Sequence, residues 1–258
     1  MDNFNVYKDI QARTKGEIYI GVVGPVRTGK STFIKRFMEL AVLPAMEDES
    51  LKAVSTDELP QSAGGKTVMT TEPKFIPKEA VQITLGDGIQ AKVRLIDCVG
   101  YMVDGATGHV ENGEERMVKT PWSEKEIPFT QAAQIGTRKV IGDHSTIGIV
   151  VTTDGSVGEL KRSAYIDAEK QTVDELKKLG KPFILLLNST KPYSDETLKL
   201  AEQLAADYGV TVLPVSCEQL KKRRYFPYSG KCFKRISCYA TGFSYSQMAG
   251  SPSGYPLA

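Results

Sequence analysis

One octapeptide constrains the fold of this chain more than any other feature. Residues 24–31 read Gly-Pro-Val-Arg-Thr-Gly-Lys-Ser and fit the pattern G-x-x-x-x-G-K-[ST]. The apolar run Ile18–Val23 precedes them, and Ser31–Leu43 follows with apolar residues at helical spacing. Glycines let backbone N–H groups turn inward around a phosphate, and the helix N-terminus adds partial positive charge. The segment is therefore predicted to be a P-loop that runs from Gly24 to Ser31. Its predicted nucleotide-binding residues are Gly24, Pro25, Val26, Arg27, Thr28, Gly29, Lys30 and Ser31, together with Thr32 just after the loop.

Two side chains of this loop have predicted chemical roles. Lys30 can reach the β- and γ-phosphates of a nucleotide, and the Ser31 hydroxyl can bind Mg²⁺. A second signal, Asp97-Cys98-Val99-Gly100, follows the apolar run Val93–Ile96. At this distance after a P-loop, Asp97 is predicted to hold Mg²⁺, and the Gly100 N–H to sense the γ-phosphate.

The segment between the first helix and the second strand contains Thr70 and Thr71. In GTPase-type folds a threonine in such a segment closes over Mg²⁺ and the γ-phosphate, so both are candidate catalytic residues and Thr70 is a candidate metal ligand. Arg27 stands three residues before Lys30, as in guanylate-binding proteins, whose loop arginine acts as an arginine finger within the same chain. The alternative is a solvated loop arginine.

The base-recognition signal of GTPases is incomplete. After the apolar run Phe183–Leu187, the expected N-K-x-D is replaced by Asn188-Ser189-Thr190-Lys191. Lys191 can only donate hydrogen bonds, whereas the missing aspartate would accept them from guanine. ATP is therefore the favoured nucleotide, with Asn188 kept as a nucleotide-site residue and Asp195 as a possible displaced substitute for the aspartate.

Apolar runs alternate with helical patterns along the first 220 residues. Such alternation predicts an α/β fold of the P-loop NTPase type, a mostly parallel sheet with helices on both faces. The segments 60–72 and 99–129 are rich in Gly, Pro, Thr and charge, and are predicted to be loops. Further strands are expected at Val81–Leu85, Ile147–Val151 and Val210–Val215, and further helices at Ser163–Leu179 and Ser194–Tyr208.

A change in composition marks a boundary near Leu220. Residues 1–220 carry 26 basic and 31 acidic side chains, whereas residues 221–258 carry seven Lys or Arg and no Asp or Glu. We therefore expect a P-loop ATPase domain at 1–220 and a basic, aromatic-rich tail at 221–258, unstructured or produced by a shifted reading frame. The four cysteines have no metal-type spacing and are expected to be free thiols, and the polar first 15 residues favour a cytoplasmic protein.

Longer stretches of the sequence resemble the stage IV sporulation protein A family, the ATPases that build the base of the spore coat. The resemblance covers residues 1 to about 222 and rests on the segments 2–10, 24–31, 65–74, 97–101 and 188–190. It implies a translation-factor GTPase-like domain that uses ATP and Mg²⁺, with Lys30 and Asp97 binding nucleotide and metal, and Thr70 and Thr71 as sensor threonines. The family sequence continues where this chain has its acid-free tail.

The same resemblance implies partners and a location. ATP hydrolysis would drive the chain to polymerise with itself on the outer forespore membrane, in the mother-cell cytoplasm. A small amphipathic membrane peptide and other coat proteins would be partners, and no nucleic acid is expected. Two other readings stay open: a dynamin- or guanylate-binding-like GTPase, and a nucleotide-binding scaffold without turnover.

Overall fold

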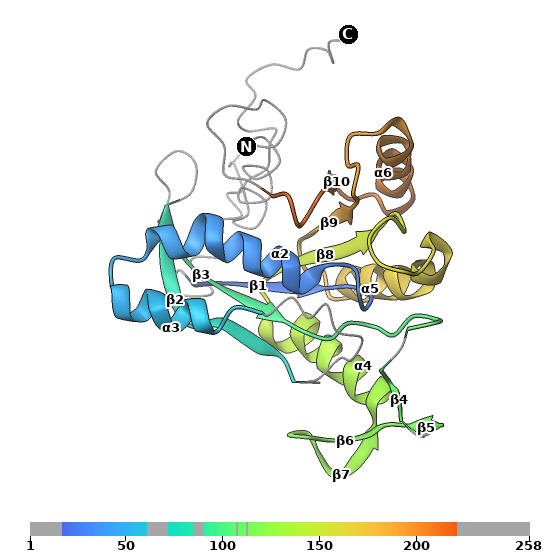
Figure 1. Cartoon of the computed structure of the whole chain (residues 1–258), viewed down its shortest axis with the longest axis horizontal. Helices are drawn as coiled ribbons and strands as arrows, with labels where there is room; N and C mark the ends of the chain where they lie inside the picture. The colour runs from blue at the N-terminus through green and yellow to red at the C-terminus, as the bar shows by residue number, and fades with distance from the viewer. Residues whose placement is uncertain (1–16, 61–71, 85–89, 107, 112, 221–258) are drawn as a thin grey trace.

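A six-stranded sheet forms the centre of the molecule (Figure 1). The computed structural model describes residues 17–60, 72–84, 90–106, 108–111 and 113–220. Within them the strand order is β10-β9-β8-β1-β3-β2. The strands are β1 (Glu17–Val23), β2 (Lys74–Thr84), β3 (Gln90–Asp97), β8 (Ile147–Thr153), β9 (Phe183–Asn188) and β10 (Val212–Val215).

The sheet is parallel except at one edge. Strand β1 pairs in parallel with β3 and β8, and the pairs β8–β9 and β9–β10 are parallel too. Only β2 runs antiparallel, along β3. Strands β8 and β9 are buried at every position, which explains their continuous apolar sequences. The predicted mostly parallel α/β architecture is confirmed.

The predicted helices are present with altered ends. The segment expected as Ser31–Leu43 is α2 (Lys30–Phe37), a wide π-helical turn η1 (Met38–Val42) and a 3₁₀ turn η2 (Leu43–Ala45). The segment Ser163–Leu179 begins as the 3₁₀ turn η5 (Arg162–Tyr165) and continues as α5 (Ile166–Lys178). Helix α6 (Asp195–Tyr208) begins at its predicted cap, where the Ser194 hydroxyl accepts from the N–H of Thr197. The helices that were not predicted are α3 (Glu49–Asp57) and α4 (Phe129–Lys139) with its π-helical extension η4 (Val140–His144).

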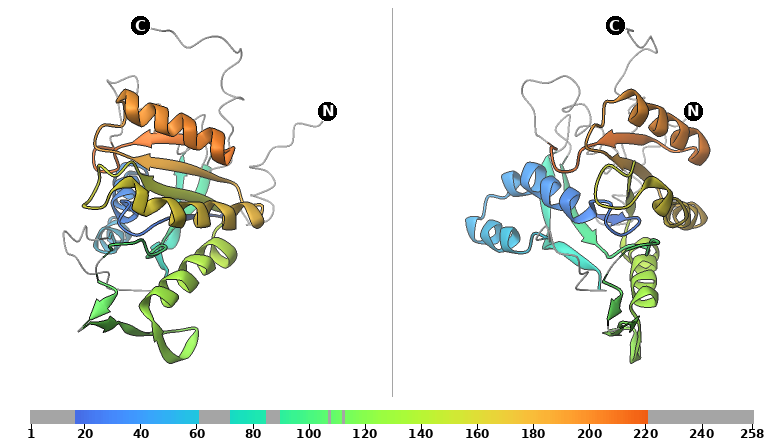
Figure 2. Two further views of the ribbon diagram at one scale, coloured as in Figure 1. Left: turned by 90° about the vertical axis from the view of Figure 1, so that its right-hand side faces the viewer. Right: turned by 45° about the vertical axis from the view of Figure 1, so that its right-hand side comes forward.

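Helices cover both faces of the sheet (Figure 2). One apolar cluster joins α2 to the strand residues on its side, including Ile20 and Val22 of β1. The second cluster joins η4, α5 and α6 to the opposite side, where Val23 of β1 points. Because successive residues of a strand point to opposite faces of the sheet, β1 contributes side chains to both apolar clusters.

The prediction that residues 99–129 form a loop is wrong. This segment contains two antiparallel ribbons, β4 (Val110–Glu111) with β5 (Glu114–Glu115), and β6 (Met117–Thr120) with β7 (Ser123–Pro128). They extend away from the central sheet at the bottom of Figure 1 and lead into α4. Most of their side chains are exposed or half-buried, so the apolar pattern that identifies a buried strand is missing. Of the predicted loop 60–72, residues 61–71 lie outside the described part, as does the tail 221–258.

The topology brings two predicted signals together. From β1 the chain passes through α2 and β2 to β3 on one side of β1, and later reaches β8 on its other side. In open α/β sheets, ligands bind at the carboxyl ends of the strands where the order reverses in this way. The segments that follow β1 and β3 meet at this point.

Candidate functional site

The glycine-rich loop, residues 24–31, connects β1 to α2, so its predicted strand–loop–helix context is confirmed. Its backbone is left-handed at Arg27 (φ 61°) and at Gly29 (φ 95°), and Gly24 has φ 132°. A Cβ atom on Gly24 would lie 2.4 Å from the Val151 carbonyl oxygen. Only glycine fits there, because the loop passes directly over β8.

Lys30 is the first residue of α2 and points back beneath the loop. Its side chain is 5% exposed, and its Nζ donates to the Pro25 carbonyl oxygen at 2.5 Å. Among the described residues no carboxylate lies within ion-pair distance of this ammonium. Burial lowers the pKa of Lys30, an effect that Cys98 and Asp97 partly offset. A buried ammonium with one neutral partner has a strong capacity to bind an anion.

Asp97 ends β3 and lies beside Val22 of β1 in the parallel register. Its Oδ2 accepts from the Ser31 hydroxyl at 3.0 Å, while its Oδ1 is buried without a partner among the described residues. Burial raises the pKa of Asp97, against the opposing charge of Lys30 and the bond from Ser31. An unpartnered carboxylate oxygen beside a hydroxyl matches the ligands that Mg²⁺ takes in proteins.

Gly100, whose N–H is predicted to sense the γ-phosphate, lies against the loop. It has φ 96°, and a Cβ there would lie 2.1 Å from the Gly24 oxygen and 2.6 Å from Lys30 Nζ. The neighbouring Cys98 is buried, and burial raises its pKa to about 11. Cys98 is a free thiol, as predicted, and Cys217 is buried too.

Asn188 ends β9 and supports the loop from below. Its Nδ2 donates to the Thr28 carbonyl oxygen at 2.9 Å, and its Oδ1 accepts from the Cys217 N–H at 3.0 Å. A Cβ on Gly29 would lie 2.4 Å from the same Nδ2. Asn188 therefore fixes the loop to the segment after β10. The part played by Cys217 is a backbone contact, which no side-chain motif reveals.

Arg27 of the loop interacts electrostatically with Tyr165 of η5. Arg27 is half-buried, and its charge partly offsets the rise that burial causes in the pKa of Tyr165. The Tyr165 ring is fully buried, and its hydroxyl lacks a hydrogen-bond partner among the described residues. Tyr165 could not be predicted from the sequence, because it follows a loop with no recognisable pattern.

The remaining candidate residues fall into two groups. Val26 is buried at the tip of the loop and Thr32 is half-buried in α2, whereas Lys191 and Asp195 are exposed beyond β9. Thr70 and Thr71 lie outside the described residues. The structure thus brings residues 24–32, Asp97, Gly100 and Asn188 into one site.

Comparison with known proteins identifies the family. A family model described as stage IV sporulation protein A, ATPase domain, matches residues 1–226. The chain belongs to the stage IV sporulation protein A family. The resemblance inferred from the sequence segments is confirmed, and with it the assignment to a family of ATPases that act in sporulation.

Individual stage IV sporulation protein A relatives agree with the family model. The protein from Bacillus subtilis (strain 168) is 54% identical over 222 residues, which are 86% of this chain and 45% of that protein. The protein from Clostridioides difficile (strain 630) is 53% identical over 220 residues, 85% of this chain and 45% of that protein. The chain therefore spans slightly under half the length of these curated relatives.

Two further observations concern shape. A crystal structure of an SsGBP mutation variant superimposes with a TM-score of 0.47 and 15% identity, over 92% of this chain and 59% of that one. Within the described part of this chain, none of the helices has the length and apolar character needed to cross a bilayer.

Proposed function

We propose that this chain is a P-loop NTPase of the translation-factor GTPase class that binds ATP with Mg²⁺ and hydrolyses it. The observation that carries the proposal is the buried ammonium of Lys30, held under a glycine-rich loop beside Asp97 and Ser31. Such a group is costly to bury unless a polyanion occupies the site for part of the working cycle. Membership of an ATPase-domain family supports the same conclusion.

The residues present fit a magnesium ion. The buried, unpartnered Oδ1 of Asp97 and the neighbouring Ser31 hydroxyl would hold it, with Thr70 joining from the segment before β2. When bound, the ion would neutralise negative charge that develops on the phosphate oxygens of the nucleotide. The Ser31–Asp97 hydrogen bond keeps the serine hydroxyl and the aspartate carboxylate together on one side of the loop.

The other residues would act on the nucleotide directly. The ammonium of Lys30 would bind the β- and γ-phosphates, and the Gly100 N–H would contact the γ-phosphate. Thr70 and Thr71 would close over the site, and Arg27, in the loop itself, would stabilise the transition state as an arginine finger. The residue after Gly100 is Tyr101, which has no side-chain amide to orient the attacking water. Arg27 would therefore contribute a larger share of the rate enhancement.

ATP is the proposed nucleotide. The segment after β9 has Lys191 where guanine-specific enzymes have an aspartate, and Asn188 is engaged with backbone groups through both ends of its amide. A lysine cannot accept the hydrogen bonds that guanine offers.

The proposed role of hydrolysis is to drive self-assembly of the spore coat basement layer at the outer forespore membrane. The similarity to stage IV sporulation protein A supports this role. Residues 1–220 would form the ATPase domain. A small amphipathic membrane peptide and other coat proteins would be partners, as the sequence resemblance implies.

Phosphate release by the purified chain tests the proposal. We expect release from ATP with Mg²⁺ well above release from GTP, and almost none from the Lys30→Ala variant, because loss of the ammonium weakens nucleotide binding by several kcal/mol. The double variant Thr70→Ala, Thr71→Ala should bind ATP and fail to hydrolyse it, because its hydroxyls act near the transition state. Faster release from GTP would favour the GTPase reading, and ATP binding without turnover in the parent would favour the scaffold.

A further inference from the structure

Tyr101 is bonded to the glycine-rich loop through its backbone. Its N–H donates to the Gly24 carbonyl oxygen at 3.2 Å, and its own carbonyl oxygen accepts from the Val26 N–H at 2.9 Å. The two bonds form a parallel bridge between Pro25 and Tyr101. A backbone N–H of a phosphate-binding loop is therefore occupied by another part of the chain.

The residue before Tyr101 closes the same space. A Cβ built on Gly100 would lie 2.6 Å from Lys30 Nζ, so the backbone of residue 100 occupies the immediate surroundings of the ammonium. An additional phosphate on this side of Lys30 would first have to move Gly100 off the ammonium, and Tyr101 with it, before the Gly100 N–H could contact that phosphate. The contact of residues 100–101 with the loop thus competes with the outermost phosphate of a nucleotide.

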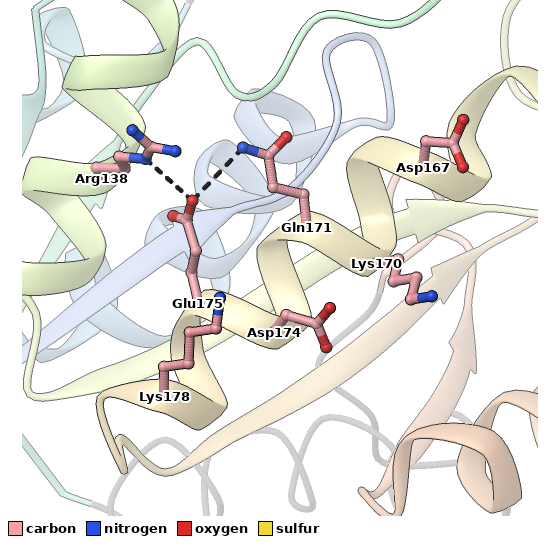
Figure 3. Close-up of a pocket in the computed structure, with 7 residues that line it drawn as sticks. All are labelled: Arg138, Asp167, Lys170, Gln171, Asp174, Glu175 and Lys178. Atoms are coloured by element: carbon pink, nitrogen blue, oxygen red, sulfur yellow. Dashed lines mark hydrogen bonds and ion pairs between the residues drawn. The ribbon is translucent and has the colours of Figure 1, made fainter.

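The side chain of Tyr101 anchors residues 100–101 to helix α5. The ring is 3% exposed, and its hydroxyl donates to Glu175 Oε2 on α5. The other oxygen of Glu175 accepts from Arg138 Nε of α4 at 3.0 Å and from Gln171 Nε2 at 3.5 Å (Figure 3). Burial and Glu175 raise the pKa of Tyr101, so its hydroxyl stays a donor across the working pH range.

This anchor leads to the molecular surface. Arg138 is 56% exposed, and Figure 3 shows it facing Glu175 across a groove between α4 and α5. The groove has a volume of about 370 Å³ and mixed charge, and is lined by Arg138, Asp167, Lys170, Gln171, Asp174, Glu175 and Lys178. Tyr101 therefore links the loop that would bind phosphate to a charged outer face, through two hydrogen bonds in series.

We propose that Tyr101 is a latch: anchored by Glu175, it holds residues 100–101 against the loop and is displaced when a nucleotide with a γ-phosphate binds. The inference rests on the proposed function and adds a positioning residue to it. Displacement of Tyr101 takes the hydroxyl from Glu175 and changes the pairing of Arg138 in the α4–α5 groove. Nucleotide state is thereby transmitted to the surface groove lined by residues of α4 and α5.

The latch should weaken the binding of ATP without weakening the binding of ADP. A nucleotide triphosphate has to break the latch, whereas a diphosphate, which lacks the γ-phosphate, does not. A hydrogen bond to a charged group changes an equilibrium by about tenfold or more. Tyr101→Phe should therefore bind a non-hydrolysable ATP analogue about tenfold more tightly than the parent and bind ADP equally well.

The experiment measures dissociation constants of ADP and the ATP analogue, with Mg²⁺, for the full chain and three variants. Tyr101→Phe should shift the ratio of the two constants by about tenfold, and Glu175→Gln, which keeps only a weaker neutral acceptor for the tyrosine hydroxyl, should shift it less in the same direction. Asp174→Asn, which changes the neighbouring acid on α5 without touching Tyr101, should leave the ratio unchanged. A general loss of packing would alter both nucleotides alike, so the ratio separates a latch from a structural role.

A second readout follows the signal to the surface. Hydrogen exchange of α4 and α5 in the parent should differ between the ADP-bound and analogue-bound forms, and this difference should disappear in Tyr101→Phe. If the parent binds both nucleotides but the ratio does not move in either variant, the latch is refuted and the proposed function survives. If the parent binds neither nucleotide, both fail.

Discussion

Replacement of Lys30 by methionine should separate nucleotide binding from folding stability. Methionine keeps most of the buried volume and removes the charge. One ammonium about 4 Å from a phosphate charge, at an effective dielectric constant of about 20, contributes about 4 kcal/mol. Its loss should weaken ATP binding by about 10³-fold. Titration calorimetry on the parent and the variant measures this change.

The same substitution should not destabilise the protein without nucleotide. Burial lowers the pKa of Lys30 in the folded state, so the unfolded chain holds that proton more tightly and the charged side chain costs stability at neutral pH. The Pro25 oxygen that loses Nζ keeps a bond from the Thr28 hydroxyl at 3.0 Å. Thermal unfolding of Lys30→Met should therefore begin no lower than that of the parent, with Lys35→Met on the same helix as control. Unchanged ATP affinity, or a large fall in the unfolding temperature of the nucleotide-free variant, would refute this reasoning.

Three other predictions concern separate parts of the chain. Arg27→Ala should retain ATP affinity and lose most hydrolysis that rises with protein concentration, since an arginine finger contributes about 10³-fold or more to the rate; Arg27→Lys should not restore it, and a parent-like rate curve would exclude the finger. Glu169→Gln should lower the free energy of unfolding by about 3 kcal/mol, because the fully buried Glu169 carboxylate pairs with the Arg162 guanidinium through N–O distances of 2.6 Å and 2.7 Å. Urea denaturation measures this change, and Glu202→Gln at an exposed position is the neutral control. Cys98 should resist iodoacetamide at pH 8 in the native chain, because a thiol with a pKa of about 11 is about 0.1% thiolate there; rapid labelling found by mass spectrometry would contradict its burial.

The sequence predicts best those strands whose side chains are buried on both faces of the sheet. Ile147–Thr153 and Phe183–Asn188 are buried on both faces, so their sequences are continuously apolar and identify parallel strands. The β4–β5 and β6–β7 ribbons contain Val110 and Met117 as exposed side chains among many charges. They are defined by backbone pairing, which leaves no apolar period in the sequence. Helix α4 contains Gly136 and Thr137, which lower helix propensity, and packing of Phe129 and Ala133 against the rest of the chain determines it instead.

The candidate site was predictable where side chains carry the chemistry. Lys30, Asp97 and Asn188 have residue types tied to their expected tasks, and the structure brings them together. The contacts that brace the loop were not predictable, because they use backbone groups of Thr28 and Cys217 or connect positions far apart in sequence. The Tyr101–Glu175 hydrogen bond spans 74 positions and follows no local pattern.

The support that Asn188 gives to the glycine-rich loop has a thermodynamic consequence. A loop that is already tied to β9 and to Cys217 does not have to be ordered by its ligand, so little conformational entropy is lost there on binding. Asn188→Ala would remove both ties and move that ordering cost into the binding step. Calorimetry would record it as a more unfavourable entropy of association, with the charges that face the phosphates unchanged.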